Sequence, residues 1–429
     1  MLGMVSKSAQ LIRKLPFPRG LLNALLQSAK VLVCRQRYRH VLRRLRRKVY
    51  ESQKLKVIFL ADDPAKWKYQ SVYDLMARSD RYEPYVAIGL RKNHDYELSF
   101  AELSSLINDR RSFYERMGCR CVMACDVRHK TLIDMKTLGA DIVFYQEPWM
   151  LFGSHTVMNV AKTALACYVP YSVEWEFDPK LHWLPNFHRL LFAAFVWNEE
   201  QAEQEKPKTP FSLSCFICAI GHTFFDDYCS KKRMRNGEYV IYAPHFSFPY
   251  NGKANLETLG TFEWNGREML EYAKVHKEIK WAWKPHPALR WQLESKGFMT
   301  HEEVDEYYAA WEEIAETKYD GDYMDLFEKS RAMITDCGSF LLEYAPTGMP
   351  IIRPLAANFS LTPSASAQKI FETYYTAHNW DELRTFLDGV IVRGDDFRRT
   401  SRLKVVKEMC LTEACASNKV IEFMDEVVD

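Results

Sequence analysis

Two histidines follow the ends of apolar runs in the C-terminal half of the chain. The stretch "WAWKPHPALR" at 281–290 places Lys284 and His286 directly after a predicted strand, with Pro285 and Pro287 on either side of the histidine. Proline fixes its own φ and favours an extended residue before it, so the backbone of His286 is restricted. A rigid turn alone does not require histidine, whereas lysine and histidine at a strand end can bind or protonate a phosphate oxygen.

A second apolar run, "EYVIYAPHF" at 238–246, contains Pro244 and His245 near its end. Open α/β sheets bind their ligands at the carboxyl ends of their strands. Because both runs are predicted strands of one domain, His245 and His286 are expected at the same sheet edge. A lone histidine is more often packed in the core or exposed, so the site is inferred from the two histidines together.

A polar turn follows the apolar run 332–334 and precedes an apolar helix. The turn consists of Thr335, Asp336, Cys337, Gly338 and Ser339. The exposed N–H groups of a helix start attract anions, Gly338 permits close approach of a phosphate, and Ser339 adds a hydroxyl. Glu343 lies about one helical turn further on, where it could accept hydrogen bonds from ribose hydroxyls. The same pattern is also typical of a plain helix cap, with Asp336 or Ser339 satisfying the first turn and Glu343 solvated.

Short apolar runs alternate with amphipathic stretches of helix length along most of the chain. In the first half the runs occupy 56–61, 85–90, 119–126, 141–146 and 166–172. In the second half they occupy 238–246, 279–287, 331–339 and 350–355. This alternation is typical of βαβ units and parallel sheets, and 429 residues exceed one ordinary core. The sequence therefore predicts two α/β domains facing a cleft, joined by the segment between the polar stretches 198–210 and 231–239.

Positive charge is concentrated at the N-terminal end. Residues 1–56 hold 15 Lys or Arg and one acid, so they are formally +14, and the remaining chain is −12 within the net charge of +2. Apolar residues alternate with arginines over 21–50, which predicts one or two basic amphipathic helices. No stretch is typical of a signal peptide or of a membrane span. We expect the chain to stay in the cytoplasm.

The cysteines indicate thiols in a reducing compartment rather than a disulfide framework, because 11 of them are scattered through apolar contexts. Two groups have roughly metal-like separations: Cys119, Cys121, Cys125 and His129, and Cys215, Cys218, His222 and Cys229. Neither group pairs two short Cys-x-x-Cys knuckles, and neither a P-loop nor a GxGxxG motif is present. No metal and no cofactor are therefore expected.

The second half of the chain resembles the CDP-glycerol glycerophosphotransferase family, the teichoic-acid primases and polymerases. The family's YAPTFR is similar to "YAPHFS" at 242–247, its K/R-x-HP to "KPHP" at 284–287, and its TDYSS to "TDCGS" at 335–339, with Glu343 at the acidic helix position that follows. The resemblance covers about residues 238–355. His245 and Ser247 replace a threonine and an arginine of the first motif, and the acceptor-side HGTPLK is absent.

The resemblance implies a GT-B fold of two Rossmann-like domains with a basic N-terminal segment. The expected parts are a membrane-associating segment at 1–50, an acceptor domain at 51–235 and a nucleotide-donor domain at 236–429. The candidate catalytic residues are His286, Glu174 and His245, and the candidate donor-binding residues are Lys284, Thr335, Asp336, Gly338, Ser339, Glu343 and Pro244. In place of HGTPLK, a base from the first domain would be Glu174, Tyr171 or His155.

The function expected from the resemblance is transfer of glycerol phosphate, or a related alditol phosphate, from a CDP-linked donor to a hydroxyl of a lipid-linked glycan. The enzyme would be peripheral, bound to anionic lipid at the cytoplasmic face of the membrane. One alternative is a GT-B glycosyltransferase that uses a nucleotide sugar. Another is a binding protein for RNA or anionic lipid with no enzymatic activity, although a body of charge −12 argues against extended nucleic-acid binding.

Overall fold

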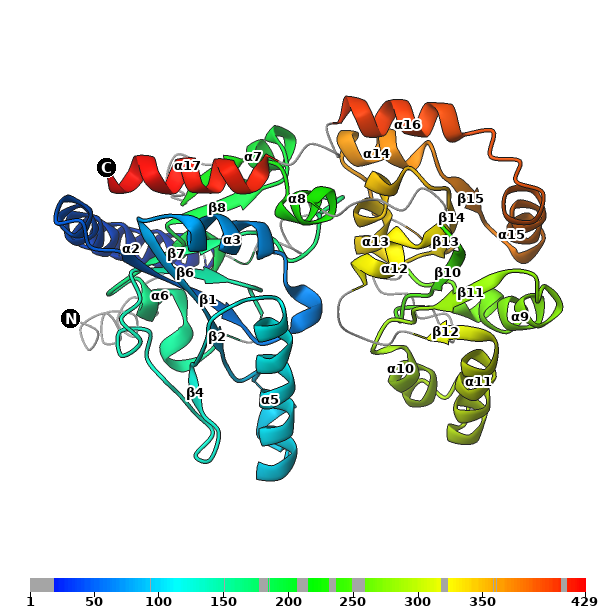
Figure 1. The fold of residues 1–429 in the computed structure, drawn as a ribbon, viewed down its shortest axis with the longest axis horizontal. Helices are drawn as coiled ribbons and strands as arrows, with labels where there is room; N and C mark the ends of the chain where they lie inside the picture. The colour runs from blue at the N-terminus through cyan, green and yellow to red at the C-terminus, as the bar shows by residue number, and fades with distance from the viewer. Residues whose placement is uncertain are drawn as a thin grey trace. The chain divides into compact units, whose positions relative to one another are not determined.

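The computed structural model describes residues 19–92, 94–149, 151–176, 184, 186–206, 215–230, 237–248, 259–317, 323–357, 359, 361–409 and 415–429. The chain divides into two compact units (Figure 1). The first comprises Met1–Tyr171, Phe177–Thr223 and Cys415–Asp429, and the second comprises Ser172–Glu176 and Phe224–Ala414. Each unit is built around one parallel sheet, as the alternation of apolar runs predicts.

The first sheet has seven strands in the order β3-β2-β1-β6-β7-β8-β9, and all neighbours are parallel. The strands are β1 Leu55–Ala61, β2 Tyr82–Ile88, β3 Cys121–Met123, β6 Ile142–Tyr145, β7 Leu165–Tyr168, β8 Ala193–Val196 and β9 Phe216–Ala219. A small antiparallel pair, β4 Cys125–Asp126 and β5 Thr131–Leu132, lies outside this sheet. The strand order reverses between β1 and β6, and such a reversal opens a crevice at the carboxyl ends of the two strands.

The helices of the first unit connect these strands. They are α2 Arg19–Tyr50, η1 Pro64–Lys66, α3 Gln70–Arg78, α4 His94–Glu97, α5 Phe100–Arg116, η2 Gly153–His155, α6 Val157–Val160, η3 His188–Leu190, α7 Glu199–Glu205 and α17 Ala416–Val428. Ser99 and Glu102 form a reciprocal capping box at the start of α5, so the sequence itself fixes where this helix begins.

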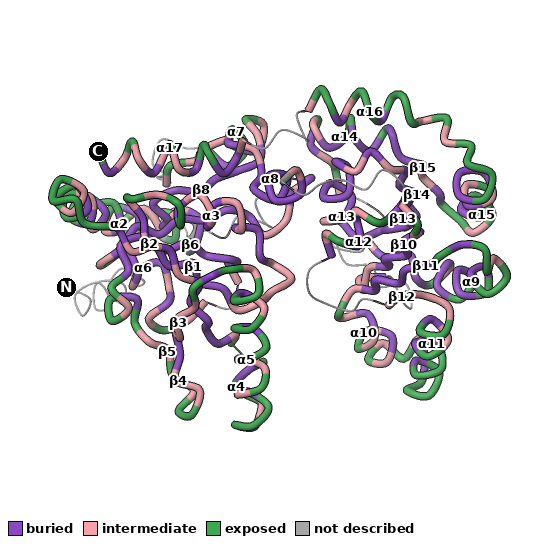
Figure 2. Tube along the Cα trace, in the orientation of Figure 1, coloured by how far each residue is buried: buried purple, intermediate pink, exposed green. Residues whose placement is uncertain are grey.

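Helix α2 is a single helix whose apolar face belongs to the first core. Val31, Cys34, Tyr38, Val41 and Leu45 are buried at alternating spacings of three and four residues, and they pack in one cluster with the first sheet. Along α2, exposed residues alternate with less exposed ones in Figure 2. This differs from the expectation of a free membrane-binding face, because the apolar stripe is already covered by protein. Residues 1–18 of the expected segment 1–50 lie outside the described residues.

Helix α17 returns from the far end of the sequence to complete the first unit. Its side chains Val420, Met424 and Val428 are buried in the first core, and it packs against α2 and α3 (Figure 1). The hydroxyl of Tyr82 donates to Asp425 at 2.6 Å. The donor domain was expected to cover 236–429, but residues 415–429 belong to the first unit, because the buried apolar side chains of α17 pack against the first sheet.

The second sheet has six parallel strands in the order β12-β11-β10-β13-β14-β15. The strands are β10 Tyr239–Ala243, β11 Lys280–Trp283, β12 Ala315–Thr317, β13 Ser330–Thr335, β14 Ile351–Pro354 and β15 Tyr375–Ala377. Its helices are α8 Thr223–Ser230, α9 Phe262–Val275, α10 Leu289–Ser295, α11 His301–Ile314, α12 Met324–Glu328, α13 Gly338–Glu343, η4 Ala345–Thr347, α14 Ala365–Phe371, α15 Trp380–Phe386, η5 Leu387–Val392 and α16 Arg399–Glu408. Large buried aromatics such as Trp281, Trp283 and Trp311 fill its core.

Five short strands of the described chain were not among the expected ones: β5, β8, β9, β12 and β15. Strand β9 lies within the segment expected to join the domains, and it is instead the seventh strand of the first sheet, paired with β8 from Ala193↔Phe216 to Val196↔Ala219. A run of four residues is too short to show a strand period. In the described part of the chain, no helix is both long and apolar enough to cross a membrane.

Candidate functional site

The strand ends that carry the histidines are neighbours in the second sheet. Strand β10 lies between β11 and β13, so all three carboxyl ends meet at one edge. Beyond the strands, Lys284 N donates to Tyr242 O at 2.9 Å and His286 N donates to Pro244 O at 3.0 Å. Prolines occupy the alternate positions, where a parallel strand would turn its N–H away from β10. The "KPHP" pattern thus extends the β10–β11 pairing and fixes the backbone of His286.

The two histidine rings lie against each other. Their centroids are 5.1 Å apart, and Phe246 packs 4.4 Å from the His286 ring. Nδ1 of His286 accepts from Ala288 N at 3.1 Å, and Nδ1 of His245 accepts from Ser247 N at 3.3 Å. An accepting Nδ1 places the proton of a neutral ring on Nε2. Burial, with His286 close by, holds the pKa of His245 well below its usual range. His245 is therefore a neutral N–H donor.

Asp336 and Thr335 hold the edge together. The Asp336 carboxylate accepts from His245 N, Thr261 N and Thr261 Oγ1, each at 2.6 Å. The Thr335 hydroxyl donates to Ala243 O at 2.8 Å. Burial raises the pKa of Asp336 to about 6 against these hydrogen bonds. Both side chains were expected to contact the donor, and in the structure their hydrogen bonds tie β13 to β10 and to the start of α9.

Gly338 leaves room for an indole. A Cβ at position 338 would lie 2.8 Å from Nε1 of Trp175 and 3.1 Å from Cδ1 of Leu259. Trp175 itself stacks on Phe359 with ring centroids 5.9 Å apart. Helix α13 has only six residues, and Trp175 approaches its first turn. The space beside Gly338 that was expected to admit a phosphate is thus occupied by the Trp175 side chain of the same unit. Ser339, the next residue, is half-buried.

The two candidate glutamates lie elsewhere than expected. Glu343 is buried rather than solvated, and the Tyr323 hydroxyl donates to its Oε2. Glu174 was expected as a base from the first domain, but the segment 172–176 belongs to the second unit. Trp175 O in this segment accepts from Ser364 N at 2.8 Å, which attaches it to the start of α14. Glu174 is half-buried beside this anchor.

A buried arginine on the same edge was not anticipated from the sequence. Arg353 lies near the end of β14, is 7% exposed, and has its guanidinium 4.9 Å from the Phe359 ring centroid and 4.7 Å from that of Phe371. No described residue gives it a hydrogen bond or an ion pair. Burial lowers its pKa to about 10, so it stays charged at neutral pH. The charge of Asp336 acts on it only at a distance, so this buried cation, which forms no ion pair with a described residue, is suited to an anionic ligand.

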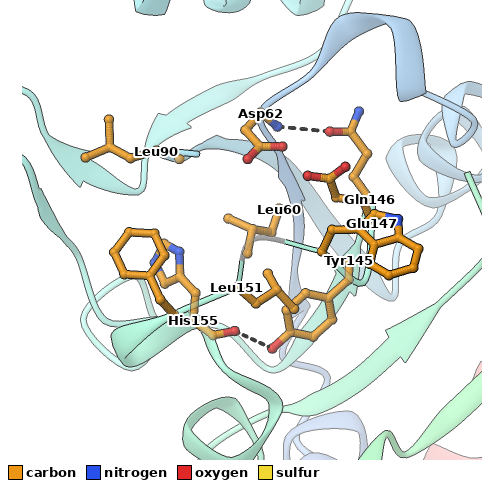
Figure 3. Close-up of a pocket in the computed structure, with 11 residues that line it drawn as sticks. Leu60, Asp62, Leu90, Tyr145, Gln146, Glu147, Leu151 and His155 are labelled. Carbon is orange, nitrogen blue, oxygen red and sulfur yellow. Dashed lines mark hydrogen bonds between the residues drawn. The ribbon is translucent and has the colours of Figure 1, made fainter. Parts of the chain in front are cut away.

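The first sheet also carries a pocket at its carboxyl edge. Its lining includes His155, whose Nε2 donates to Ile133 O at 2.8 Å, and the acids Asp62 and Glu147 (Figure 3). Burial lowers the pKa of His155, so the ring is neutral near pH 7. His155 therefore does reach a pocket, whereas Tyr171 lies beside Lys66, whose Nζ is 5.3 Å from the tyrosine ring centroid.

The cysteine groups show no metal geometry among the residues that are described. Within those residues no cluster of three or more His, Cys, Asp or Glu could hold an ion. His222 instead hydrogen-bonds through Nε2 to Pro170 O at 2.9 Å. Burial raises the pKa of Cys119 to about 12 and that of Cys218 to about 11, which makes both unreactive thiols.

Comparison with solved structures identifies the architecture. The Neisseria meningitidis UDP-GlcNAc 2-epimerase bound to UDP-GlcNAc has a TM-score of 0.50 at 11% identity over 87% of this chain and 100% of its own. The S. aureus MnaA–UDP structure has a TM-score of 0.51 at 12% identity over 87% and 96%. The wall teichoic acid polymerase TagF has a TM-score of 0.50 at 11% identity over 96% and 99%. No protein-family model and no curated protein matches the chain. The chain has the GT-B fold.

Proposed function

We propose that the protein is a GT-B transferase that moves glycerol phosphate, or a related alditol phosphate, from a CDP-linked donor to a hydroxyl of a lipid-linked glycan in surface-polymer synthesis. The observation that carries this proposal is the edge of the second sheet, where Lys284, His245 and His286 gather on adjacent strand ends. The fold shared with TagF and with the UDP-bound S. aureus MnaA supports a nucleotide-donor enzyme of this kind.

The charges of this edge suit a diphosphate. Lys284 and Arg353 supply two cations, and the Nε2–H groups of His245 and His286 supply hydrogen-bond donors. During transfer the acceptor oxygen bonds to the phosphorus of the alditol phosphate, and the bond from that phosphorus to the CMP oxygen breaks with its electron pair. His286 stabilises the departing phosphate oxygen, and Glu174 receives the acceptor proton.

The donor class is tested by calorimetry and by product analysis. Full-length protein is first titrated calorimetrically with CDP, UDP and ADP. It is then incubated with CDP-glycerol and a synthetic lipid-linked disaccharide, and the mass of the product is measured by mass spectrometry. We expect CDP to bind most tightly and the disaccharide to gain one or more glycerol phosphate units. Transfer of a sugar from a UDP-sugar, with CDP-glycerol left intact, would replace the proposal by a nucleotide-sugar enzyme, the second candidate favoured by the epimerase fold.

We further propose peripheral attachment to anionic lipid through the exposed face of α2. Leu32 is 56% exposed, and Arg39, Arg43 and Tyr50 are exposed at spacings that place them on the same side of the helix. Deleting the helix would also remove part of the first core, so point variants are the better test. Replacing Arg39 and Arg43 by glutamate should weaken binding to phosphatidylglycerol vesicles, since each basic residue near such a surface contributes about 1 kcal/mol. Unchanged vesicle retention would exclude this face.

A further inference from the structure

The pocket of the first unit lies at the crevice where the strand order reverses. Asp62 is the first residue after β1, and Glu147 is the second residue after β6. The two acids therefore lie on either side of the point where the strand order reverses, between these neighbouring strands. In Figure 3 their carboxylates lie close to each other on the upper side of the pocket. Tyr145, Trp149 and Phe152 contribute aromatic side chains to its lining. The pocket therefore combines acidic oxygens with apolar ring surface.

One carboxylate oxygen of Glu147 accepts no hydrogen bond from the described residues. Its side chain is 4% exposed, and Oε2 accepts from Lys66 Nζ, whereas Oε1 is buried without any hydrogen-bond donor among the described residues. A buried carboxylate oxygen left without a donor costs free energy, because it has lost its hydration. Such an atom in the lining of a pocket is suited to a ligand that brings a donor with it.

The carboxylate of Asp62 is a second group in the pocket that can accept a hydrogen bond from a ligand. Its backbone N–H donates to Gln146 Oε1 at 3.0 Å, and the described residues offer its carboxylate no hydrogen-bond donor. Burial and the nearby Glu147 raise the pKa of Asp62 to about 7, against the charges of Arg91, Arg110 and Lys66. Asp62 is therefore ionised in part at neutral pH and gains from any hydroxyl that donates to it.

The surrounding charges exclude an anion and give a cation little advantage. Asp63 is held by Arg91 at 3.3 Å and by Lys66 at 3.6 Å, and Lys66 also contacts Glu147. Arg110 is fully engaged with Asp95 through bonds of 2.7 and 3.0 Å. The three acids thus exceed Lys66 and Arg91 by one negative charge, which the partial protonation of Asp62 reduces but does not remove. A phosphate would meet two carboxylates, whereas a neutral ligand with hydroxyl groups meets two acceptors.

We propose that this pocket is the subsite for a neutral sugar or polyol, in which one ligand hydroxyl donates to Glu147 Oε1, another donates to Asp62, and the apolar face of the ligand packs on the aromatic lining. Carboxylates that accept from hydroxyls give strong, charge-assisted hydrogen bonds, and the rings cover the C–H surface of a sugar. This rests on the proposed function, for which it names the class of acceptor group that the first unit holds.

The test measures binding of small neutral probes to the full chain. Methyl N-acetyl-β-D-glucosaminide and glycerol are titrated by saturation-transfer NMR, with glucose 6-phosphate and glycerol 3-phosphate as charged analogues. We expect at least one neutral probe to bind and to lose roughly tenfold in affinity in Asp62→Asn and in Glu147→Gln, because each amide can present a donor in place of an acceptor. The control is Asp126→Asn, an exposed acid of the same unit paired with His129.

The outcomes separate this inference from the proposed function. CDP binding is measured on the same variants and should not change. If CDP binds but no neutral probe shows binding that depends on Asp62 or Glu147, the subsite is overturned while the donor proposal stands. If the neutral probe binds as expected but CDP does not, the donor proposal is overturned while the subsite stands. A phosphorylated probe whose affinity falls in Asp62→Asn as much as that of the neutral probe would also overturn the inference.

Discussion

The two sheets end in edges of opposite chemical character. Both are carboxyl edges of parallel sheets with apolar strands behind them. The edge of the first sheet presents Asp62 and Glu147, with one carboxylate oxygen to which no described residue donates. The edge of the second presents Lys284, two histidine Nε2–H donors and Arg353, which forms no ion pair with a described residue, while the Asp336 carboxylate there already accepts three hydrogen bonds.

The difference shows how one architecture can hold two unlike ligands. A parallel sheet supplies only the place, namely strand ends that converge on one side. The residue directly after each strand then decides whether that place attracts anions or accepts hydroxyl protons. We infer that the second edge holds a diphosphate and the first a neutral polyol, and each change below tests one side of this contrast.

The largest effect is expected from His286→Gln at the second edge. Glutamine keeps a hydrogen-bonding amide but cannot supply a proton at neutral pH, so turnover should fall roughly 10²-fold or more while CDP still binds. Transfer to a lipid-linked disaccharide is the measurement, and His301→Gln, an exposed histidine of the same unit, is the control. A folded His286→Gln enzyme with near wild-type turnover would remove this histidine from the chemistry.

Arg353→Met should separate binding from stability. Methionine retains apolar contact with Phe359 and Phe371 but removes the guanidinium charge. CDP affinity should fall about 10- to 100-fold, whereas the urea midpoint of the ligand-free protein should stay the same or rise, since a lone buried charge is destabilising. Arg267→Met on an exposed helix face serves as control. Unaltered CDP affinity would mean that the diphosphate does not use this arginine.

Alanine substitutions at two glycines, one at each edge, test how closely side chains pack there. Alanine at Gly338 would place its Cβ 2.8 Å from the Trp175 indole nitrogen, whereas alanine at Gly89 would meet Leu60 at an ordinary 3.5 Å. We expect Gly338→Ala to lower the free energy of unfolding by about 1–3 kcal/mol and Gly89→Ala to change it by less than about 0.5 kcal/mol. Equal urea midpoints would show that Trp175 moves away from α13 at no cost.

The smallest effect concerns pH at the first edge. The raised pKa of Asp62, about 7 against 3.8 in an unfolded chain, means that its contribution to stability declines as pH rises through this window. Asp62→Asn should therefore be more stable than the wild type at pH 8, by on the order of 1 kcal/mol after solvent screening, and the advantage should shrink toward pH 5. A pH-independent difference in urea midpoints would contradict the charge assigned to this edge.

The second edge was largely predictable and the first was not, although one rule covers both. Apolar runs ending in Pro244-His245 and Lys284-Pro285-His286 indicated strand ends, and parallel pairing brought them together as expected. The acids after β1 and β6 carry the same signal, and Pro64 and Pro148 follow them closely, but acids beside a proline are also typical of ordinary surface turns. That Arg353 forms no ion pair with a described residue depends on which side chains surround it, and a sequence does not show such tertiary contacts.

The return of α17 to the first unit affects how the protein is made. A ribosome releases the chain from its N-terminus, and domains generally fold in that order. Here the first sheet leaves the ribosome early, yet the residues that cover part of its core, Val420, Met424 and Val428, emerge after the whole second unit. The nascent first unit therefore exposes apolar surface while the second unit is synthesised, which leaves it prone to aggregation until residues 416–428 are free to dock.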